Sequence, residues 1–462
     1  MFGLLATGCG STPTGTAQGP LQVRIWRSGQ TVDAFKPVIS AFELANPGKV
    51  TVTYTDHDLN GYELSALKSL AARQGPDIWS IPNTWLGDHV ARIQSLPDNF
   101  FDDIAAGTSS SSSSATPPAI GAVTAVKQLY PTGIADQIIS TDGKSVLGAP
   151  SSVDVLRLYY NPDVFSAATL DYLKSLGSGY SDSQYQPVRQ LLASPPTTWS
   201  TLLNQEKYIT KRNGKDITRG TIALGTADNT PESESILQLM MLQNGATIVT
   251  ADRTRTRIQA TDSTASGGTV RPGQNALDFY TSFSNPNNPN YTWNPSMPDA
   301  LDAFGQGKLA MVIAYSDFGA KLKQSYPELD VQQAPVPQIG PAQTQAQVNF
   351  IRFDVEIVTQ TADSYEAATK FLHRYIVPDQ LNDIVNQGGL ISPYLTKLNA
   401  NQDVFPNAEV LTGQTVFEKD RANFDAAFHQ MIVDVSQNGI STGDAIDAAS
   451  DKLNGYLAEP DE

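Results

Sequence analysis

The sequence of 462 residues contains a single cysteine, Cys9, so it cannot form an internal disulfide or a paired-cysteine metal or redox motif. It has no apolar run of the ~18 residues that a membrane-spanning helix needs. Positive charge is also scarce, because the chain has 31 Lys and Arg but 47 Asp and Glu, which gives a net charge of −16. A nucleic-acid-binding surface must be positive, so we expect no nucleic-acid partner.

The single cysteine follows a short apolar patch and small residues in "LLATGC", which resembles the lipobox of a bacterial lipoprotein signal peptide. In that family the cysteine becomes the first mature residue and carries the lipid. Ala6 stands where leucine is usual, and the basic and long apolar parts are missing upstream, so we expect the natural chain to start earlier. The segment "GSTPTGTAQGP" has no core-forming residue, so residues 1–20 are predicted to be a lipobox and a flexible tether. The alternative is a free thiol near the chain end.

Strand and helix patterns alternate after the tether. The sequence predicts strands over 21–26, 49–55 and 77–81, and helices over 31–48 and 62–75. Strand–helix–strand order with short connections implies parallel pairing, so the predicted fold class is α/β.

Two polar stretches interrupt this alternation. Residues 102–120 contain "TSSSSSSATPP" and are predicted to be a disordered surface loop, and residues 251–273 a second surface loop. Further helices are expected over 364–377 and, as a pair around "NG", over 420–457.

The sequence contains no complete catalytic or metal-binding motif. "DHDLNG" at 56–61 matches the start of an EF-hand loop, but Leu67 stands where the loop needs a glutamate, so these residues are predicted to form a turn. GxSxG, HExxH and GxxxxGK[ST] are absent, and the four histidines are scattered. We therefore expect no metal and no cofactor, although an unrecognised pair of catalytic carboxylates stays open.

Aromatic, amide and acidic residues gather where predicted strands end, which is where open α/β sheets bind ligands. Sugars pack their C–H faces on aromatic rings and need fixed donors and acceptors for their hydroxyls. Trp79 lies inside its strand and is expected in the core instead. The candidates for ligand binding are Trp26, Ser28, Asn83, Trp85, Ser152, Asp154, Asn229, Tyr315 and Ser316.

The order of several segments resembles the extracellular solute-binding proteins of ABC importers, family 1, the maltose-binding-protein-like sugar-binding lipoproteins. The segments that carry this resemblance are "AFELANPGKVTVTY", "AARQGPDIWSIPNTWL", "TTWSTLLNQEKYIT", "RGTIALGTADN", "AFGQGKLAMVIAYS" and "EAATKFLHRYIV". They span roughly residues 21 to 455.

The resemblance implies a two-lobed periplasmic-binding-protein-like fold of type II, with hinge crossings. The first α/β lobe would hold 21–151 plus 350–398, and the second 155–347 plus 399–462. The crossings would lie near "SSVDV", near "NFIRFDV" and just past "ISP".

The resemblance also implies a function. The protein would capture a mono- or oligosaccharide between its lobes and deliver it to an ABC permease, as a monomer on the outer face of the plasma membrane in the cell envelope. Arg352 stands where many relatives have glycine, and it could indicate an anionic ligand. A surface adhesion lipoprotein and an extracellular glycan-active enzyme are the alternatives.

Overall fold

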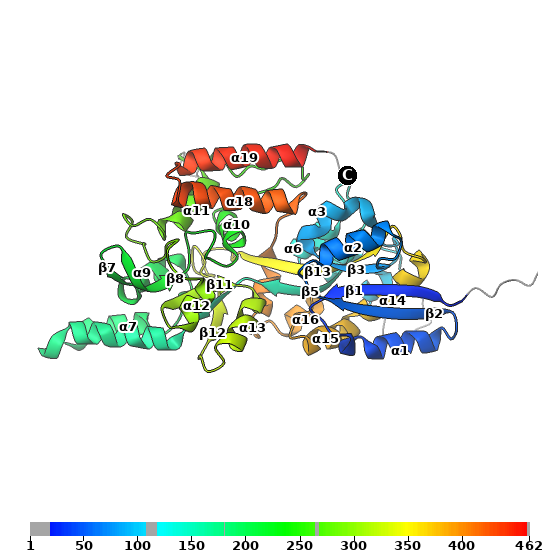
Figure 1. The fold of residues 1–462 in the computed structure, drawn as a ribbon, viewed down its shortest axis with the longest axis horizontal. Coiled ribbons are helices and arrows are strands. Elements are labelled where there is room, and N and C mark those ends of the chain that lie inside the picture. The colour runs from blue at the N-terminus through cyan, green and yellow to red at the C-terminus, as the bar shows by residue number, and fades with distance from the viewer. Residues whose placement is uncertain (1–18, 108–117, 180, 264–267, 460–462) are drawn as a thin grey trace, which may run out of the picture.

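The computed structural model describes residues 19–107, 118–179, 181–263 and 268–459. Within them the chain forms two large β-sheets with separate hydrophobic cores, one toward each end of an elongated molecule (Figure 1). The two-lobed α/β fold predicted from the sequence is confirmed. Cys9 lies outside the described residues, so the lipid anchor stays a prediction.

The first lobe is built on a seven-stranded sheet. Strand β1 (Leu21–Ser28) pairs in parallel with β2 (Val50–His57) and β3 (Ile78–Pro82), and helices α1 (Lys36–Ala45) and α2 (Tyr62–Ala71) connect these strands. The long strand β13 (Asn349–Thr359) pairs with β3. It also pairs with the remaining strands, which are β4 (Ile93–Gln94), β5 (Ala149–Val155) and β14 (Gly413–Gln414). The other helices of this lobe are α3 (Leu86–His89), α4 (Asp102–Ala105), α5 (Ala122–Leu129), α6 (Thr132–Ile138), α14 (Tyr365–Ile376), α15 (Pro378–Gln387), α16 (Leu395–Ala400) and α17 (Asn407–Leu411).

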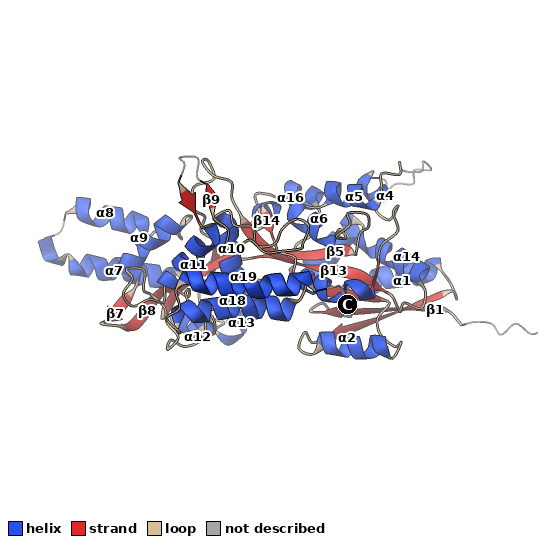
Figure 2. Cartoon of the chain, turned by 90° about the horizontal axis from the view of Figure 1, so that it is seen from above, coloured by secondary structure: helices blue, strands red, loops and turns tan. Residues whose placement is uncertain are grey.

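The second lobe is built on a five-stranded sheet. Its strands, in sheet order, are β12 (Gln332–Pro335), β6 (Arg157–Tyr160), β11 (Leu309–Ala314), β8 (Asp216–Ile222) and β7 (Lys211–Asn213). Its last two helices, α18 (Arg421–Ser436) and α19 (Thr442–Ala458), lie side by side across the molecule (Figures 1 and 2). The other elements are α7 (Pro162–Ser175), α8 (Asp182–Leu191), α9 (Trp199–Ile209), α10 (Ser233–Gln243), β9 (Asp262–Ser263), β10 (Thr269–Val270), α11 (Pro272–Ser282), α12 (Ala300–Gly305) and α13 (Ser316–Ser325).

Three passages join the lobes. Strand β5 leads through Leu156 into β6, and β13 begins at the second core and continues into the first. The third passage follows β14, because Val410 belongs to the first core and Phe424 to the second. The predicted lobe boundaries stay predictions, but the packing of Leu398 and Val410 in the first core favours a third crossing after β14 rather than just past residue 393.

Two local predictions differ from the structure. The helix expected over 31–48 is a 3-10 turn (Val32–Ala34) followed by α1, because Pro37 fits only the first turn of a helix. The loop expected over 102–120 begins with the short helix α4, whose first residue, Asp102, is buried beside Phe101. A four-residue helix carries too little periodicity to be read from sequence.

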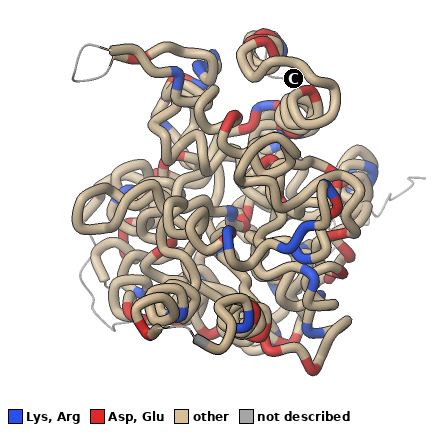
Figure 3. Tube along the Cα trace, turned by 90° about the vertical axis from the view of Figure 1, so that its left-hand side faces the viewer, with Lys and Arg blue, Asp and Glu red and all other residues tan. Residues whose placement is uncertain are grey.

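Charged residues of both signs are interspersed along the trace in the view from the end of the second lobe (Figure 3). The net charge of −16 is therefore not gathered into one acidic face in this view.

Candidate functional site

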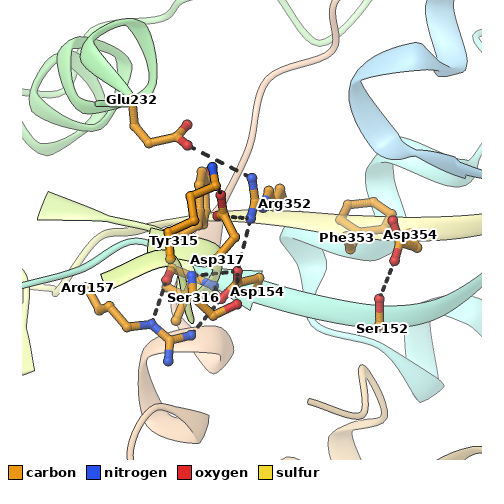
Figure 4. Close-up of polar contacts among 12 residues, drawn as sticks. Ser152, Asp154, Arg157, Glu232, Tyr315, Ser316, Asp317, Arg352, Phe353 and Asp354 are labelled. Atoms are coloured by element: carbon orange, nitrogen blue, oxygen red, sulfur yellow. Dashed lines mark hydrogen bonds and ion pairs between the residues drawn. The ribbon is translucent and has the colours of Figure 1, made fainter. Parts of the chain in front are cut away.

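Strands β5 and β13 carry paired polar residues through the middle of the molecule. In their antiparallel register Arg352 lies opposite Asp154, and Asp354 lies opposite Ser152. The Ser152 hydroxyl donates to Asp354 Oδ2 at 2.7 Å (Figure 4). Side chains on these strands can therefore reach both lobes.

Asp154 joins the crossing strand β5 to the second lobe. Its Oδ1 accepts hydrogen bonds from the Val155 amide (2.9 Å) and Arg157 Nη2 (2.6 Å). Its Oδ2 accepts from the Ser316 amide (3.0 Å), the Ser316 hydroxyl (2.7 Å) and Arg352 Nη2 (3.3 Å). Ser316 begins α13 and Arg157 begins β6, so the Asp154 carboxylate connects β5 with both of these segments.

Arg352 is surrounded by negative charge. Its guanidinium lies 2.7 Å from Asp317 Oδ1, 3.3 Å from Asp154 Oδ2 and 4.0 Å from Glu232 Oε1, and 4.0 Å above the Tyr315 ring (Figure 4). Burial would raise the pKa of Asp317, but Arg352 and Lys321 outweigh burial and lower it. Arg352 thus serves as the counter-ion of the cluster.

Glu232 is the strained member of this cluster. Burial raises the pKa of Glu232 to about 7, against the lowering effect of Arg352. Its backbone, at the N-terminal cap of α10, has φ of 55°, a left-handed conformation that glutamate rarely adopts. Such strain is found most often at functional sites.

A cavity of about 580 Å³ adjoins the Asp154 contacts. Asp154 lines it from the crossing strand, and Arg157 and Ser316 line it from the second lobe. The opposite wall is the first-lobe segment from α15 to α17. Its volume falls in the range of small-molecule sites, which is about 300–1,000 Å³.

Carboxamides are prominent in that opposite wall. It contains four asparagines, one lysine, one aromatic ring and a serine: Asn382, Asn386, Asn401, Asn407, Lys397, Phe405 and Ser392. The Ser392 hydroxyl is buried and has no hydrogen-bond partner among the described residues. Phe405 lies 5.8 Å from the Arg157 guanidinium. The cavity is thus bounded by a crossing strand and by both lobes.

A separate aromatic cluster lies in the first lobe. Trp26 packs on His57 at 4.3 Å between ring centroids, and Trp85 packs on Trp79 at 6.3 Å. Arg421 of α18 lies 5.3 Å from the Trp85 ring. The rings of Trp79 and Trp85 are buried, so they act here as core, as the sequence predicts for Trp79.

Arg421, on α18 of the second lobe, contacts two acidic residues of the first lobe beside this cluster. Its Nη2 lies 3.0 Å from Glu63 Oε2 of α2, and its amide donates to Asp88 Oδ1 of α3 at 3.3 Å. Burial raises the pKa of Asp88 to about 6. This contact is a second connection between the lobes, beside the crossing strands.

The structure brings together only some of the residues predicted for binding. Asp154 and Ser316 line the cavity, and Arg352 and Tyr315 adjoin them in the cluster described above. Ser152 bonds instead to Asp354 on β13. Trp26, Ser28 and Trp85 do not line the cavity.

Two predicted residues have structural partners instead. Asn83 Oδ1 accepts from the Phe353 amide at 2.9 Å, and its amide nitrogen donates to Thr415 at 3.2 Å. Asn229 accepts from Trp293 Nε1 at 3.1 Å and donates to two backbone carbonyls. Their binding roles stay predictions, and these contacts leave their amides little capacity for a ligand.

Sequence reasoning missed several polar residues of the site. Arg157, Glu232 and Asp317 belong to the charged cluster. Asp317 follows Tyr315 and Ser316 at the end of β11, so its position indicates a binding residue although it is outside the predicted binding set. The asparagines between 382 and 407 follow no pattern that marks a site. The turn predicted over 56–61 is present, with Asp58 Oδ1 accepting from the Asn60 amide at 3.0 Å.

Among the described residues no group of three or more His, Cys, Asp or Glu is placed to hold a metal ion. The same residues contain no helix of the length and apolarity that crossing a membrane requires.

Comparison with known proteins gives a family and a fold. A family model described as bacterial extracellular solute-binding protein matches residues 38–412. The cyclic α-maltosyl-1,6-maltose binding protein of Arthrobacter globiformis is 18% identical, with a TM-score of 0.64 over 95% of this chain and 100% of that one.

Two further solved structures are similar. An ABC transporter solute-binding protein of Thermotoga lettingae, bound to α-D-tagatose, is 16% identical with a TM-score of 0.62 over 95% of this chain and 100% of that one. The sugar-binding protein MalE of Xanthomonas citri is 16% identical with a TM-score of 0.63 over 95% and 97%. A search of curated proteins gave no match.

Proposed function

The chain belongs to the bacterial extracellular solute-binding proteins, and from that premise we propose that it binds a carbohydrate between its lobes and delivers it to an ABC importer. Proteins of this family bind solutes rather than convert them, so the protein is not an enzyme. Ligand contacts from both lobes would stabilise one arrangement of the lobes, and only that difference in affinity shifts the population.

One observation carries the proposal: the cavity of about 580 Å³ is walled by the crossing strand β5, by Arg157 and Ser316 of the second lobe, and by the asparagine-rich segment of the first. A ligand in this position contacts both lobes at once. Amide and hydroxyl groups suit sugar hydroxyls, because each can donate or accept a hydrogen bond. The similar solved structures include proteins described as binding maltosyl-maltose and tagatose, which supports the same ligand class here.

A thermal-shift screen with mono- and oligosaccharides tests the proposal. A sugar at 100 times its dissociation constant stabilises the folded protein by about 2.7 kcal/mol. That corresponds to a rise of about 5–10 °C in Tm for a lobe of this size. If none of the sugars raises Tm and the protein adheres to surfaces instead, the adhesion alternative replaces this proposal. Release of a modified sugar would contradict a binding protein and favour the alternative of a glycan-active enzyme.

Matched asparagine variants test whether the ligand lies in the cavity. Asn382→Ala or Asn386→Ala each removes one neutral hydrogen bond, and we expect sugar affinity to fall about 3- to 10-fold. Asn399→Ala is the control, because Asn399 is exposed on α16 and does not line the cavity. Equal sugar affinities for all three variants would show that the ligand does not bind in this cavity.

We further propose that Cys9 carries a lipid anchor that holds the protein near its permease, since a tether raises the effective concentration of the pair. The sequence "LLATGC" and the Gly, Ser, Thr and Pro residues that follow support this role. Cys9→Ser should release the protein from the membrane without changing its affinity for sugar. Membrane retention of this variant would contradict the anchor.

A further inference from the structure

The cations that border the cavity already have carboxylate partners. Arg157 pairs with Asp154 at 2.6 Å, and both side chains are nearly buried. Lys397, which lines the other wall, pairs with Asp379 at 2.5 Å. Arg352, just beyond Asp154, is shared by three carboxylates.

Each of the three guanidinium nitrogens of Arg157 already donates a hydrogen bond within the protein. Its Nη2 donates to Asp154, its Nη1 to Gln333 Oε1 at 3.2 Å and its Nε to the Val155 carbonyl at 3.4 Å. A carboxylate or phosphate placed here would also lie beside the negative charge of Asp154, which it would repel. An acidic ligand would therefore compete with Asp154 for the same guanidinium.

Neutral polar groups, in contrast, have unused hydrogen-bonding capacity. No side-chain hydrogen bond is formed by Asn382 or Asn386 within the described part of the chain, and both line the cavity. The buried Ser392 hydroxyl in the same lining also has no partner there. Buried polar groups in proteins are nearly always hydrogen-bonded, so this hydroxyl offers one further contact to a polar occupant.

We infer that the cavity selects an uncharged, polyhydroxylated ligand and discriminates against the acidic form of the same molecule. This inference depends on the proposed carbohydrate-binding function and narrows it. It also assigns Arg352 a different role from the anion site that its sequence position suggested: Arg352 neutralises carboxylates of the protein. Hydroxyls can fill the amide and serine positions without separating any ion pair.

The test compares neutral sugars with their uronic acids, which differ only by a carboxylate, in a thermal-shift and titration-calorimetry series at pH 7. We expect the neutral member of a pair to bind and the uronate to bind at least about tenfold more weakly. If a uronate binds as well as its neutral partner or better, the inference is wrong while the proposed function stands. If neither member of any pair binds, both fail.

A pair of aspartate variants tests the charge argument directly. Asp379→Asn removes the partner of Lys397, and the Asp379 side chain is 78% exposed and outside the cavity lining, so the variant should fold. We expect uronate affinity to rise about fivefold, the size of an exposed ion-pair effect, and neutral-sugar affinity to stay within twofold. Asp383→Asn makes the same charge change on the same helix without releasing a lysine, and it should leave both affinities unchanged. Equal effects of the two variants would overturn the role given to Lys397.

Discussion

Replacing Asp154 by asparagine tests whether one carboxylate holds the crossing strand to the second lobe. The substitution keeps the shape of the side chain but removes its charge and turns one acceptor into a donor. The new NH₂ group would face donors from Arg157 or Ser316, since both oxygens of Asp154 accept hydrogen bonds. The side chains of Asp154 and Arg157 are 12% and 9% exposed, so water can compensate only in part.

The expected cost follows from these contacts. Removing one partner of a buried ion pair destabilises a protein by about 3–5 kcal/mol. Asparagine still offers one acceptor, so we expect a loss near the lower limit, about 3 kcal/mol. For a lobe of this size that loss lowers Tm by about 6–12 °C.

Calorimetry of the unliganded protein measures this loss, with Asp33→Asn as the matched control. Asp33 also pairs with a cation, Lys36 at 2.5 Å, but the side chains are 74% and 65% exposed. An exposed pair contributes at most about 1 kcal/mol, so the control should change Tm by no more than a few degrees. Equal shifts for Asp154→Asn and Asp33→Asn would refute the idea that Asp154 joins the lobes.

Two further predictions concern contacts between segments. Burial raises the pKa of Asp88 to about 6 where it meets Arg421, whereas an exposed aspartate titrates near 3.9. Arg421 itself lowers this pKa, so the raised value reflects burial of Asp88 in the folded protein. The folded chain therefore binds the proton more tightly than the unfolded chain, so Asp88→Asn should reduce the gain in stability that accompanies a fall in pH from 7 to 5 in urea titrations; an unchanged pH dependence would contradict the shift. Gly133→Ala would place a methyl group 2.1 Å from the Gly413 carbonyl and should destabilise the protein by about 1–3 kcal/mol in urea titrations. Gly455→Ala, in open space on α19, should instead be neutral or stabilising by about 0.5–1 kcal/mol, and the reverse order would refute the packing.

Local sequence patterns were sufficient to predict most elements of the fold. Strand β1 alternates buried and partly exposed residues, and α14 buries one face from Ala367 to Ile376, so each pattern reports its own environment. The order of such segments then identifies two α/β lobes. Short or proline-interrupted elements, such as α4 and the start of α1, lack enough periodic residues for this reasoning.

The ligand site was only partly predictable, because its contacts join distant residues. Asp154 and Ser316 were both expected near a ligand, but nothing in the sequence indicated that these residues, 162 positions apart, bond to each other. Trp85 was expected to face a sugar because it follows a strand in a polar loop. Its ring is buried because α2 and α18 bring Tyr62 and Arg421 against it, and strand-end position alone cannot reveal such packing.

Hydrogen-bond capacity separates the residues that hold the lobes together from those left to bind a ligand. Asp154 accepts from five donors, so a ligand could approach it only by displacing a protein contact. Asn382 and Asn386 face the same cavity without a side-chain partner among the described residues. Sequence reasoning ranked candidates by chemical type, for which aspartate and tryptophan stand out, whereas selectivity depends on which groups remain unpaired after folding. A ligand that uses only the unpaired groups can bind without weakening the contacts between the lobes, and this is why we expect neutral sugars to be accepted and their acids to be excluded.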